Sequence, residues 1–176
     1  RILDPESGAD CPAGKPGEIL VRGWNIMLGY YNMPEQTAKA IDADGWLHTG
    51  DLGVLDPEGR LRFSGRLKDT IRVGGENVAP AEVEDVLHRH PAVELAQVIG
   101  VPDPRLLEVP AAYVVLKAGA AATPAELIAW CRERCANFRV PRYVRLVDGF
   151  ERIGMTGSSK VQTSKLREFA LDDLGL

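Results

Sequence analysis

The spacing of apolar residues predicts short strands in the first third of the chain. Residues 17–23 (GEILVRG) alternate apolar and polar side chains, which is typical of a strand. Residues 45–66 alternate on both sides of a DPEG turn, in which Pro57 fixes φ and Gly59 can adopt positive φ. Between these runs, residues 32–42 favour a short helix with Pro34 in its first turn. We therefore expect a β-rich segment with one helix.

The pattern changes after residue 70. Residues 80–91 carry apolar side chains at helical spacing, with Pro80 in the first turn and Pro91 at the stop. Residues 123–138 predict a second helix, because Thr123, Pro124 and Glu126 match a capping box. Further elements are predicted as β-rich runs at 93–103, 110–119 and 142–150, a loop at 154–160 and a closing helix at 163–174.

These patterns divide the chain. The composition shifts between Arg66 and Thr70, where an all-strand segment with one helix gives way to a unit of about 105 residues, a normal size for a small domain. We predict an α+β fold in which a short antiparallel sheet is flanked by helices. The first residues have no initiator Met and begin on a strand-like fragment, so we expect the chain to be a piece of a larger protein.

Composition and charge narrow the function classes. The 176 residues are 45% hydrophobic and 26% charged, as in ordinary globular proteins. The formal net charge of −4 argues against a general nucleic-acid binder. No apolar run reaches the roughly 20 residues of a membrane span and no signal peptide is evident, which favours a reducing cytoplasm.

Metal and disulfide chemistry are not indicated. Three cysteines at irregular spacing do not make a disulfide framework: Cys11, Cys131 and Cys135. The last two lie four residues apart without a neighbouring histidine, so we expect no metal site. The histidines show no arrangement typical of a catalytic dyad and are treated as incidental: His48, His88 and His90.

A few polar residues could bind an anionic ligand. The carboxylate of Asp51 could accept hydrogen bonds from a ribose diol, or could cap a turn. Arg66 could direct its guanidinium at a ribose or phosphate, or pair with a surface acid. Gly74-Gly75 lack the spacing of a phosphate loop and fit either a close ligand approach or a plain turn. Lys160 follows a small, hydroxyl-rich loop, although most such lysines are only solvated.

Taken in order, these segments resemble the C-terminal third of adenylate-forming acyl-CoA synthetases, and most closely the medium- and long-chain fatty acyl-CoA ligases. The resemblance is carried by five stretches that cover most of the chain: residues 17–37, 45–84, 98–103, 138–148 and 155–168. It implies that residues 1–66 are the β-rich end of a large N-terminal domain, 67–69 a hinge and 70–176 a small mobile domain.

The resemblance also implies roles for single residues. Asp51 matches the aspartate that holds the ribose hydroxyls of ATP and acyl-adenylate, and Arg66 matches the arginine beside it. Lys68 matches the hinge position about which the small domain rotates. Gly74 and Gly75 match the loop along which the pantetheine arm of coenzyme A enters, and Lys160 matches the catalytic lysine of adenylation.

The implied function is an ATP-dependent acid–CoA ligase that activates a carboxylic acid, expected to be a fatty acid. Its cofactors would be ATP, coenzyme A and Mg²⁺, held mainly by the N-terminal domain upstream of Arg1, so this chain alone should be inactive. An adenylation domain that loads a carrier protein, or a non-catalytic module that kept the fold, are the alternatives.

Two stretches depart from the family pattern. In residues 154–160, Gly154 replaces the usual Pro, Ser159 replaces the glycine before the lysine, and Gly157 is an additional glycine. These changes should loosen the loop and alter the placement of Lys160. Residues 106–110 replace the usual acidic-glycine turn, so we expect a different loop there.

Overall fold

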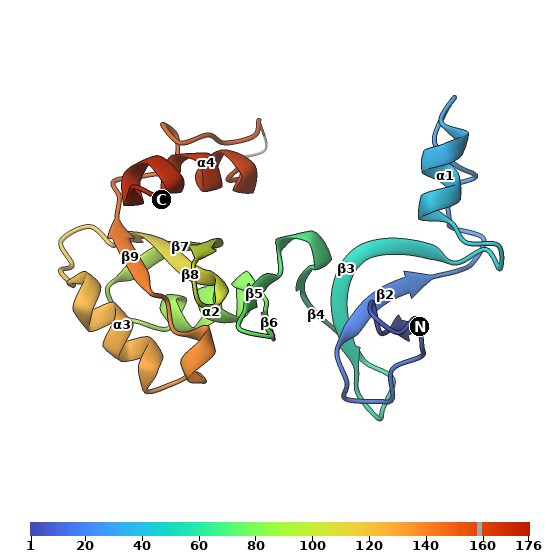
Figure 1. Cartoon of the computed structure of the whole chain (residues 1–176), viewed down its shortest axis with the longest axis horizontal. Coiled ribbons are helices and arrows are strands. Elements are labelled where there is room, and N and C mark those ends of the chain that lie inside the picture. Colours follow the sequence, from blue (N-terminus) through green and yellow to red (C-terminus); the bar gives the residue numbers. More distant parts are fainter. Residues whose placement is uncertain (158–159) are drawn as a thin grey trace. The chain divides into compact units, whose positions relative to one another are not determined.

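The computed structural model describes residues 1–157 and 160–176. The backbone contacts divide the chain into two compact units, Arg1–Lys68 and Asp69–Leu176 (Figure 1). The division falls within residues 67–69, for which the family resemblance implies a hinge. Rotation at this position stays a prediction.

The first unit is a four-stranded antiparallel sheet in the order β1-β2-β3-β4. The strands are β1 (Ile2–Leu3), β2 (Gly17–Val21), β3 (Leu47–Leu55) and β4 (Leu61–Arg66). Helix α1 (Pro34–Ala40) lies between β2 and β3 in the sequence, with Pro34 at its start. The predicted turn joins β3 to β4. There Gly59 has φ +78° and the Asp56 carboxylate accepts from the Arg60 N–H at 2.8 Å.

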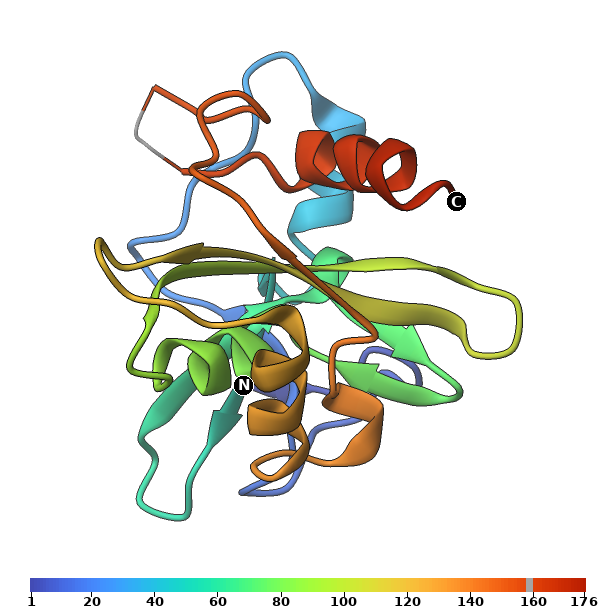
Figure 2. The same ribbon diagram turned by 90° about the vertical axis from the view of Figure 1, so that its left-hand side faces the viewer.

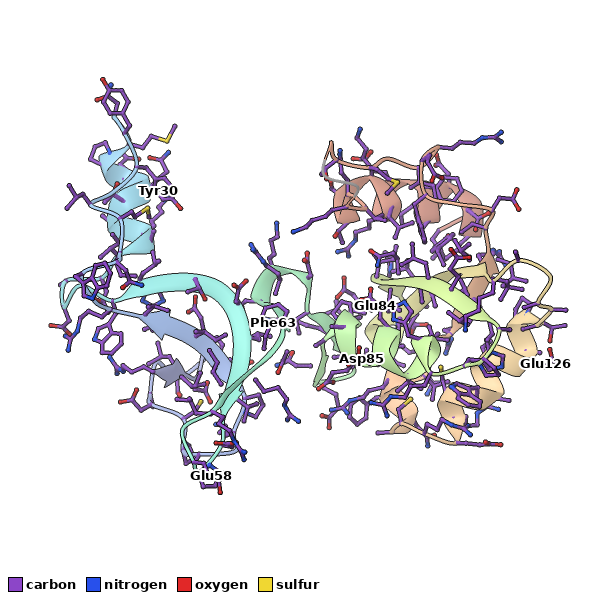
Figure 3. The ribbon with its side chains drawn as sticks, turned by 180° about the vertical axis from the view of Figure 1, so that it is seen from behind. Tyr30, Glu58, Phe63, Glu84, Asp85 and Glu126 are labelled. Atoms are coloured by element: carbon purple, nitrogen blue, oxygen red, sulfur yellow. The ribbon has the colours of Figure 1, made fainter. Side chains whose placement is uncertain are left out.

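The first unit buries a small core. Its buried apolar side chains are Ile2, Ile19, Leu20 and Val54. In contrast, Trp24, Leu28 and Tyr31 are almost fully exposed, and Tyr30 is half exposed beside α1 (Figure 3). The segment from residue 24 to residue 31 therefore leaves these four large side chains in contact with water.

The second unit contains a five-stranded sheet. Its strands are β5 (Ile71–Val73), β6 (Glu76–Val78), β7 (Val93–Asp103), β8 (Leu107–Leu116) and β9 (Tyr143–Leu146). The long β7–β8 hairpin is its centre, β5 and β6 extend it, and β9 also pairs with β8. All pairs are antiparallel except β8–β9, which is parallel. The predicted α+β fold is confirmed, with β9 as a parallel addition to the antiparallel sheet.

Helices cover both faces of this sheet (Figures 1 and 2). Helices α2 (Pro80–His88) and α3 (Pro124–Arg132) pack on one face, and α4 (Thr163–Leu174) on the other. Successive side chains of β8 point to opposite faces of the sheet. Ala112 and Val114 therefore join the core beneath α2 and α3, while Ala111 and Tyr113 join the core beneath α4. The second unit thus has two apolar layers.

Several helix ends have the predicted geometry. In the capping box of α3, the Glu126 N–H donates to Thr123 Oγ1 at 3.3 Å and the Thr123 N–H donates to Glu126 Oε2 at 2.7 Å. Helix α2 begins at Pro80 as expected. Short 3-10 helices occur at η1 (Leu67–Asp69) and η2 (Asn137–Arg139). Within the described residues, no helix is long and apolar enough to cross a membrane.

Candidate functional site

Asp51 and Arg66 form a cross-strand pair in the first unit. The two residues stand opposite each other in β3 and β4, and Arg66 Nε lies 2.8 Å from Asp51 Oδ1. The Asp51 side chain is 29% exposed and that of Arg66 is 56% exposed. A pair this accessible contributes little to stability, but it places a carboxylate and a guanidinium group side by side on neighbouring strands.

A bulge in β3 positions Asp51. Glu18 pairs with Leu52 and Leu20 pairs with His48, so residues 49–51 of β3 stand opposite Ile19 alone. Gly50 within this bulge has φ +69°, a conformation that suits glycine. A second irregularity follows on the β4 side, between Leu52 and Gly53. Bulges bend a strand and redirect its side chains, and they are common beside active sites.

Side chains satisfy the hydrogen-bonding groups of the bulge. The Gly50 N–H donates to Glu18 Oε1 at 3.0 Å, and the Asp51 N–H donates to Thr49 Oγ1 at 3.0 Å. His48 Nδ1 lies 2.9 Å from Glu18 Oε2. Sequence analysis, which found no catalytic-dyad or metal arrangement at His48, did not reveal this contact. The contact with Glu18 spans 30 residues and leaves no local signal.

Gly74 and Gly75 form the turn of a β5–β6 hairpin. Val73 pairs with Glu76, so the two glycines are the whole loop, and both have positive φ, +58° and +94°. This geometry is a two-residue turn of the kind that glycine favours. Strands β5 and β6 were not predicted, and the glycine pair precedes β6 rather than α2. The Gly74 N–H also donates to the Leu106 carbonyl at 2.8 Å, which ties the hairpin to the turn between β7 and β8.

A cavity of about 300 Å³ lies in the second unit. Its lining includes Val73 and Leu106, which flank the glycine turn, and two arginines, Arg132 and Arg142. Arg142 Nη1 lies 3.2 Å from Asp103 Oδ2, while Asp103 Oδ1 accepts from the backbone N–H groups of Arg105 and Leu106. These two N–H donors, with the nearby arginines, hold the pKa of Asp103 below its ordinary value. Sequence reasoning missed this cavity, because its lining is assembled from distant segments.

Of residues 106–110, where we expect a loop that differs from the family pattern, residues 107–110 lie in strand β8. Leu107 has φ +72°, a left-handed conformation that a branched side chain seldom adopts, and it is 67% exposed. The following residue, Glu108, accepts from the Arg72 N–H at 3.1 Å and pairs with Arg167 of α4. The acidic residue of this turn thus links β5, β8 and α4.

Two hydrogen bonds join Lys160 to Thr156 in the second unit. The Thr156 N–H donates to the Lys160 carbonyl at 2.7 Å, and the Lys160 N–H donates to Thr156 Oγ1 at 3.2 Å. The side chain of Lys160 is exposed. Gly154 has φ +141°, and its N–H donates to the Phe150 carbonyl at 3.0 Å, so a proline would fit neither feature. Ser159, the other departure in this loop, lies outside the described residues.

The remaining candidate, Lys68, lies in η1 with its side chain exposed, at the last position of the first unit. The structure thus brings Asp51 and Arg66 together in one unit and places Gly74, Gly75 and Lys160 in the other. In the part of the chain that the structure describes, no group of three or more His, Cys, Asp or Glu residues could hold a metal ion.

Comparison with known proteins gives consistent results. Residues 82–160 match the family described as the AMP-binding enzyme C-terminal domain. The chain is 53% identical over 161 residues to the 3-[(3aS,4S,7aS)-7a-methyl-1,5-dioxo-octahydro-1H-inden-4-yl]propanoyl:CoA ligase of Rhodococcus jostii, and covers 31% of that protein with 92% of its own length. It is 44% identical over all 176 residues to the putative acyl-CoA synthetase YngI of Bacillus subtilis, covering 32% of it.

A solved structure gives the same result for the fold. The crystal structure of ATP-bound MatB from Rhodopseudomonas palustris superposes with a TM-score of 0.90 at 37% identity, over 98% of this chain and 34% of MatB. The chain therefore spans about a third of the length of these similar proteins.

Proposed function

The chain belongs to the adenylate-forming, AMP-binding enzymes, and on that premise we propose that it acts as the C-terminal part of an acid–CoA ligase. This longer ligase would form an acyl-adenylate from ATP and a carboxylic acid, and then transfer the acyl group to coenzyme A. The proposal is supported by the share of about a third that the chain covers in each similar protein. The exposed apolar side chains of residues 24–33 also suit a surface that packs against further protein.

The observation that carries the proposal is the Asp51–Arg66 pair on the bulged strand. A ribose offers two neighbouring hydroxyl donors, and a carboxylate can accept both. Arg66 Nε lies 2.8 Å from one oxygen of Asp51 and so orients the carboxylate, and a guanidinium group is a donor suited to ribose and phosphate oxygens. We assign the ribose of ATP and of the acyl-adenylate to this pair.

The coenzyme A side of the proposal rests on the second unit. A pantetheine arm is thin and needs a surface without side chains, which the Gly74-Gly75 turn offers. The neighbouring cavity adds two arginines, Arg132 and Arg142, and coenzyme A carries phosphates that guanidinium groups bind well. Asp103 orients Arg142 toward such a ligand.

Lys160 would serve the first half-reaction. A carboxylate becomes an acylating agent only when its oxygen is joined to phosphorus, and this step builds negative charge at the α-phosphate. A fixed ammonium group stabilises that charge best in a site sheltered from water. A thiol must later reach the same carbonyl carbon, so the lysine and the thiol cannot occupy one position together. Rotation at residues 67–69 would exchange them.

The residues of this chain suit ATP and coenzyme A better than they suit Mg²⁺. Asp51 and Arg66 fit a ribose, and the arginines fit phosphates, whereas no acidic cluster in the described residues fits the cation. We therefore assign Mg²⁺ to the remainder of the longer ligase.

The acid is proposed as a class only. The resemblance to fatty acyl-CoA ligases and the name of the Rhodococcus relative, an inden-4-yl propanoyl:CoA ligase, both point to a carboxylic acid with an apolar acyl group. Linear fatty acids and ring-bearing propanoic acids are both members of this class.

A two-stage assay of the longer ligase tests the proposal. With ATP, Mg²⁺ and a panel of apolar acids, acid-dependent exchange of labelled pyrophosphate into ATP should report adenylate formation, and coenzyme A should then yield an acyl thioester. Acylation of a pantetheinylated carrier protein without acyl-CoA would favour the carrier-loading alternative. Binding of ATP with no exchange for any acid would indicate a module that kept the fold without catalysis.

A further inference from the structure

The bulge that presents Asp51 depends on a buried carboxylate from another strand. Glu18 lies on β2 and is only 7% exposed, although glutamate is rarely buried unless it is paired. It stands opposite Leu52, immediately beside the three residues of β3 that bulge outward. The contacts of its two carboxylate oxygens explain why a glutamate is buried at this position.

One oxygen of Glu18 replaces a lost ladder bond. Because residues 49–51 stand opposite Ile19 alone, they cannot all pair with the β2 backbone. The Gly50 N–H instead donates to Glu18 Oε1 at 3.0 Å, and the Thr49 hydroxyl donates to the Ile19 carbonyl at 2.7 Å. An unpaired buried N–H is unfavourable, so the bulge requires these side-chain partners.

The second oxygen of Glu18 fixes the side chain itself. Oε2 lies 2.9 Å from His48 Nδ1, and His48 Nε2 lies 4.0 Å from Asp42 Oδ2. Asp42 in turn accepts from the Trp46 N–H at 2.8 Å in the turn that precedes β3. A row of polar side chains therefore runs from this turn to the Gly50 backbone, one residue before Asp51.

We propose that Glu18, held by His48, is a positioning residue that sets the carboxylate of Asp51 for the ribose through its hydrogen bond to Gly50. The inference rests on the proposed function, because it assigns Asp51 to the ribose. Glu18 contacts no substrate in this scheme. It determines the path of the backbone that carries Asp51.

Discrimination between ATP and 2′-deoxy- or 3′-deoxy-ATP tests this role in the longer ligase. The measured quantity is the ratio of KM for the deoxy analogue to KM for ATP in acid-dependent pyrophosphate exchange. The unaltered enzyme should prefer ATP by about tenfold or more, the value of a hydrogen bond to a charged group. Asp51→Ala should bring this KM ratio close to one. Glu18→Ala should abolish most of the preference for ATP.

Two further measurements separate positioning from a general loss of structure. In the double variant Glu18→Ala/Asp51→Ala, the ratio should equal that of Asp51→Ala alone, because both changes act on one contact. Glu18→Gln keeps an oxygen that can accept from Gly50 and should retain the ratio to within about twofold. Glu6→Gln, an exposed glutamate of the same unit, should leave it unchanged.

The outcomes are distinguishable. If Glu18→Ala lowers kcat while the ratio is kept, or if its effect multiplies with that of Asp51→Ala, Glu18 does not position Asp51. If Asp51→Ala itself keeps the unaltered ratio, the assignment of the ribose to Asp51 fails instead. Should Glu18→Ala not fold, Glu18→Gln and His48→Ala decide, since the proposal requires the ratio to survive the first and fall in the second.

Discussion

The ammonium group of Lys160 is the charge on which the first half-reaction should depend most. In the longer ligase, we expect Lys160→Ala to slow acyl-adenylate formation by about 10²-fold or more, the usual cost of one lost electrostatic contact in a sheltered site. Thioester formation from pre-made adenylate should be much less affected. Pyrophosphate exchange measures the first step and acyl-CoA release from adenylate measures the second.

Lys165 provides a control for this prediction, because it is an exposed lysine five residues further along. Lys165→Ala should leave both steps close to their original rates. An equal loss in both half-reactions for Lys160→Ala would mean that the lysine is not specific to adenylation. The altered loop around Gly154 would then be the first candidate cause of the misplaced lysine.

Leu107 allows a stability prediction at a single residue. A φ of +72° is energetically unfavourable for a branched residue such as Leu107. Its side chain is 67% exposed, so it buries little apolar surface that could offset this strain. We expect Leu107→Gly to raise the free energy of unfolding by about 0.5–1 kcal/mol, after the entropy that glycine loses on folding is subtracted. Denaturant titration of this chain measures the change.

Leu95 is the matched control, because it is an exposed leucine in strand β7 of the same unit without positive φ. Leu95→Gly should lower stability by a similar amount. If both substitutions destabilise, strain at Leu107 is not a significant cost.

Single residues differ in how far the sequence reveals them. The capping box of α3 is readable because Thr123 and Glu126 meet within one helical turn. The contact of Glu18 with His48 was not predicted, because it joins two strands across 30 residues. The left-handed conformation of Leu107 was not predicted as such either, since leucine carries no signal for it.

Helix α2 protects the free edge of strand β7. One turn apart on the helix, Glu84 accepts from the Val98 N–H at 2.8 Å and His88 accepts from the Ala96 N–H at 3.1 Å (Figure 3). Side chains of a helix thus replace a neighbouring strand, which limits unwanted edge pairing. The periodicity of α2 predicts its buried face from Val83 and Leu87, but it gives no indication of these edge contacts.

This arrangement buries the carboxylate of Glu84, which affects stability. Burial raises the pKa of Glu84, and the nearby carboxylates of Asp85 and Asp69 raise it further, against the lowering effect of the Val98 N–H. The pKa of Glu84 is therefore higher in the folded chain than the ordinary value of 4.5 that applies when the chain is unfolded. Because the folded chain then binds the proton more tightly, stability falls as the pH rises from 4.5 through the folded pKa. Ionised Glu84 therefore destabilises the folded chain at neutral pH.

Glu84→Gln tests this effect, because the amide oxygen can still accept from Val98 while the charge is removed. The variant should be more stable than the original chain at neutral pH, and the difference should vanish below about pH 4. Unfolding titrations across this range measure it, with the exposed Glu94→Gln as control. A variant that is less stable at neutral pH would show that the ionised hydrogen bond outweighs burial.

At the level of elements, long patterned segments were predictable and short ones were not. The helices at 80–88 and 163–174 follow from their periodicity and from proline or loop signals at their ends. Strands β5 and β6 have only three residues each, too few for a period to be recognised. As a consequence, the sequence pattern does not show that Gly74-Gly75 turn a hairpin.

The whole molecule is divided at Lys68, where the first compact unit ends. The sequence indicated a boundary between residues 66 and 70 from the change in pattern alone. It could not indicate motion there, because a pattern of residues does not encode a rotation. The proposed exchange of Lys160 for a thiol requires that motion, so the pivot is the property of the chain that most needs a direct test.

Lys68→Pro provides this test in the longer ligase. Lys68 lies in η1 with an exposed side chain, so little packing is lost by its replacement. Proline fixes φ near −65°, restricts Leu67 before it and removes an N–H, so one of the two domain arrangements should become hard to reach. We expect adenylation to survive and thioester formation to fail, because a locked pivot can still serve the half-reaction that comes first.

Lys68→Ala leaves the backbone free to turn and should change both reactions little. The two variants are compared on acid plus ATP and on pre-made adenylate plus coenzyme A. Equal behaviour of the two in both assays would place the pivot elsewhere in the chain.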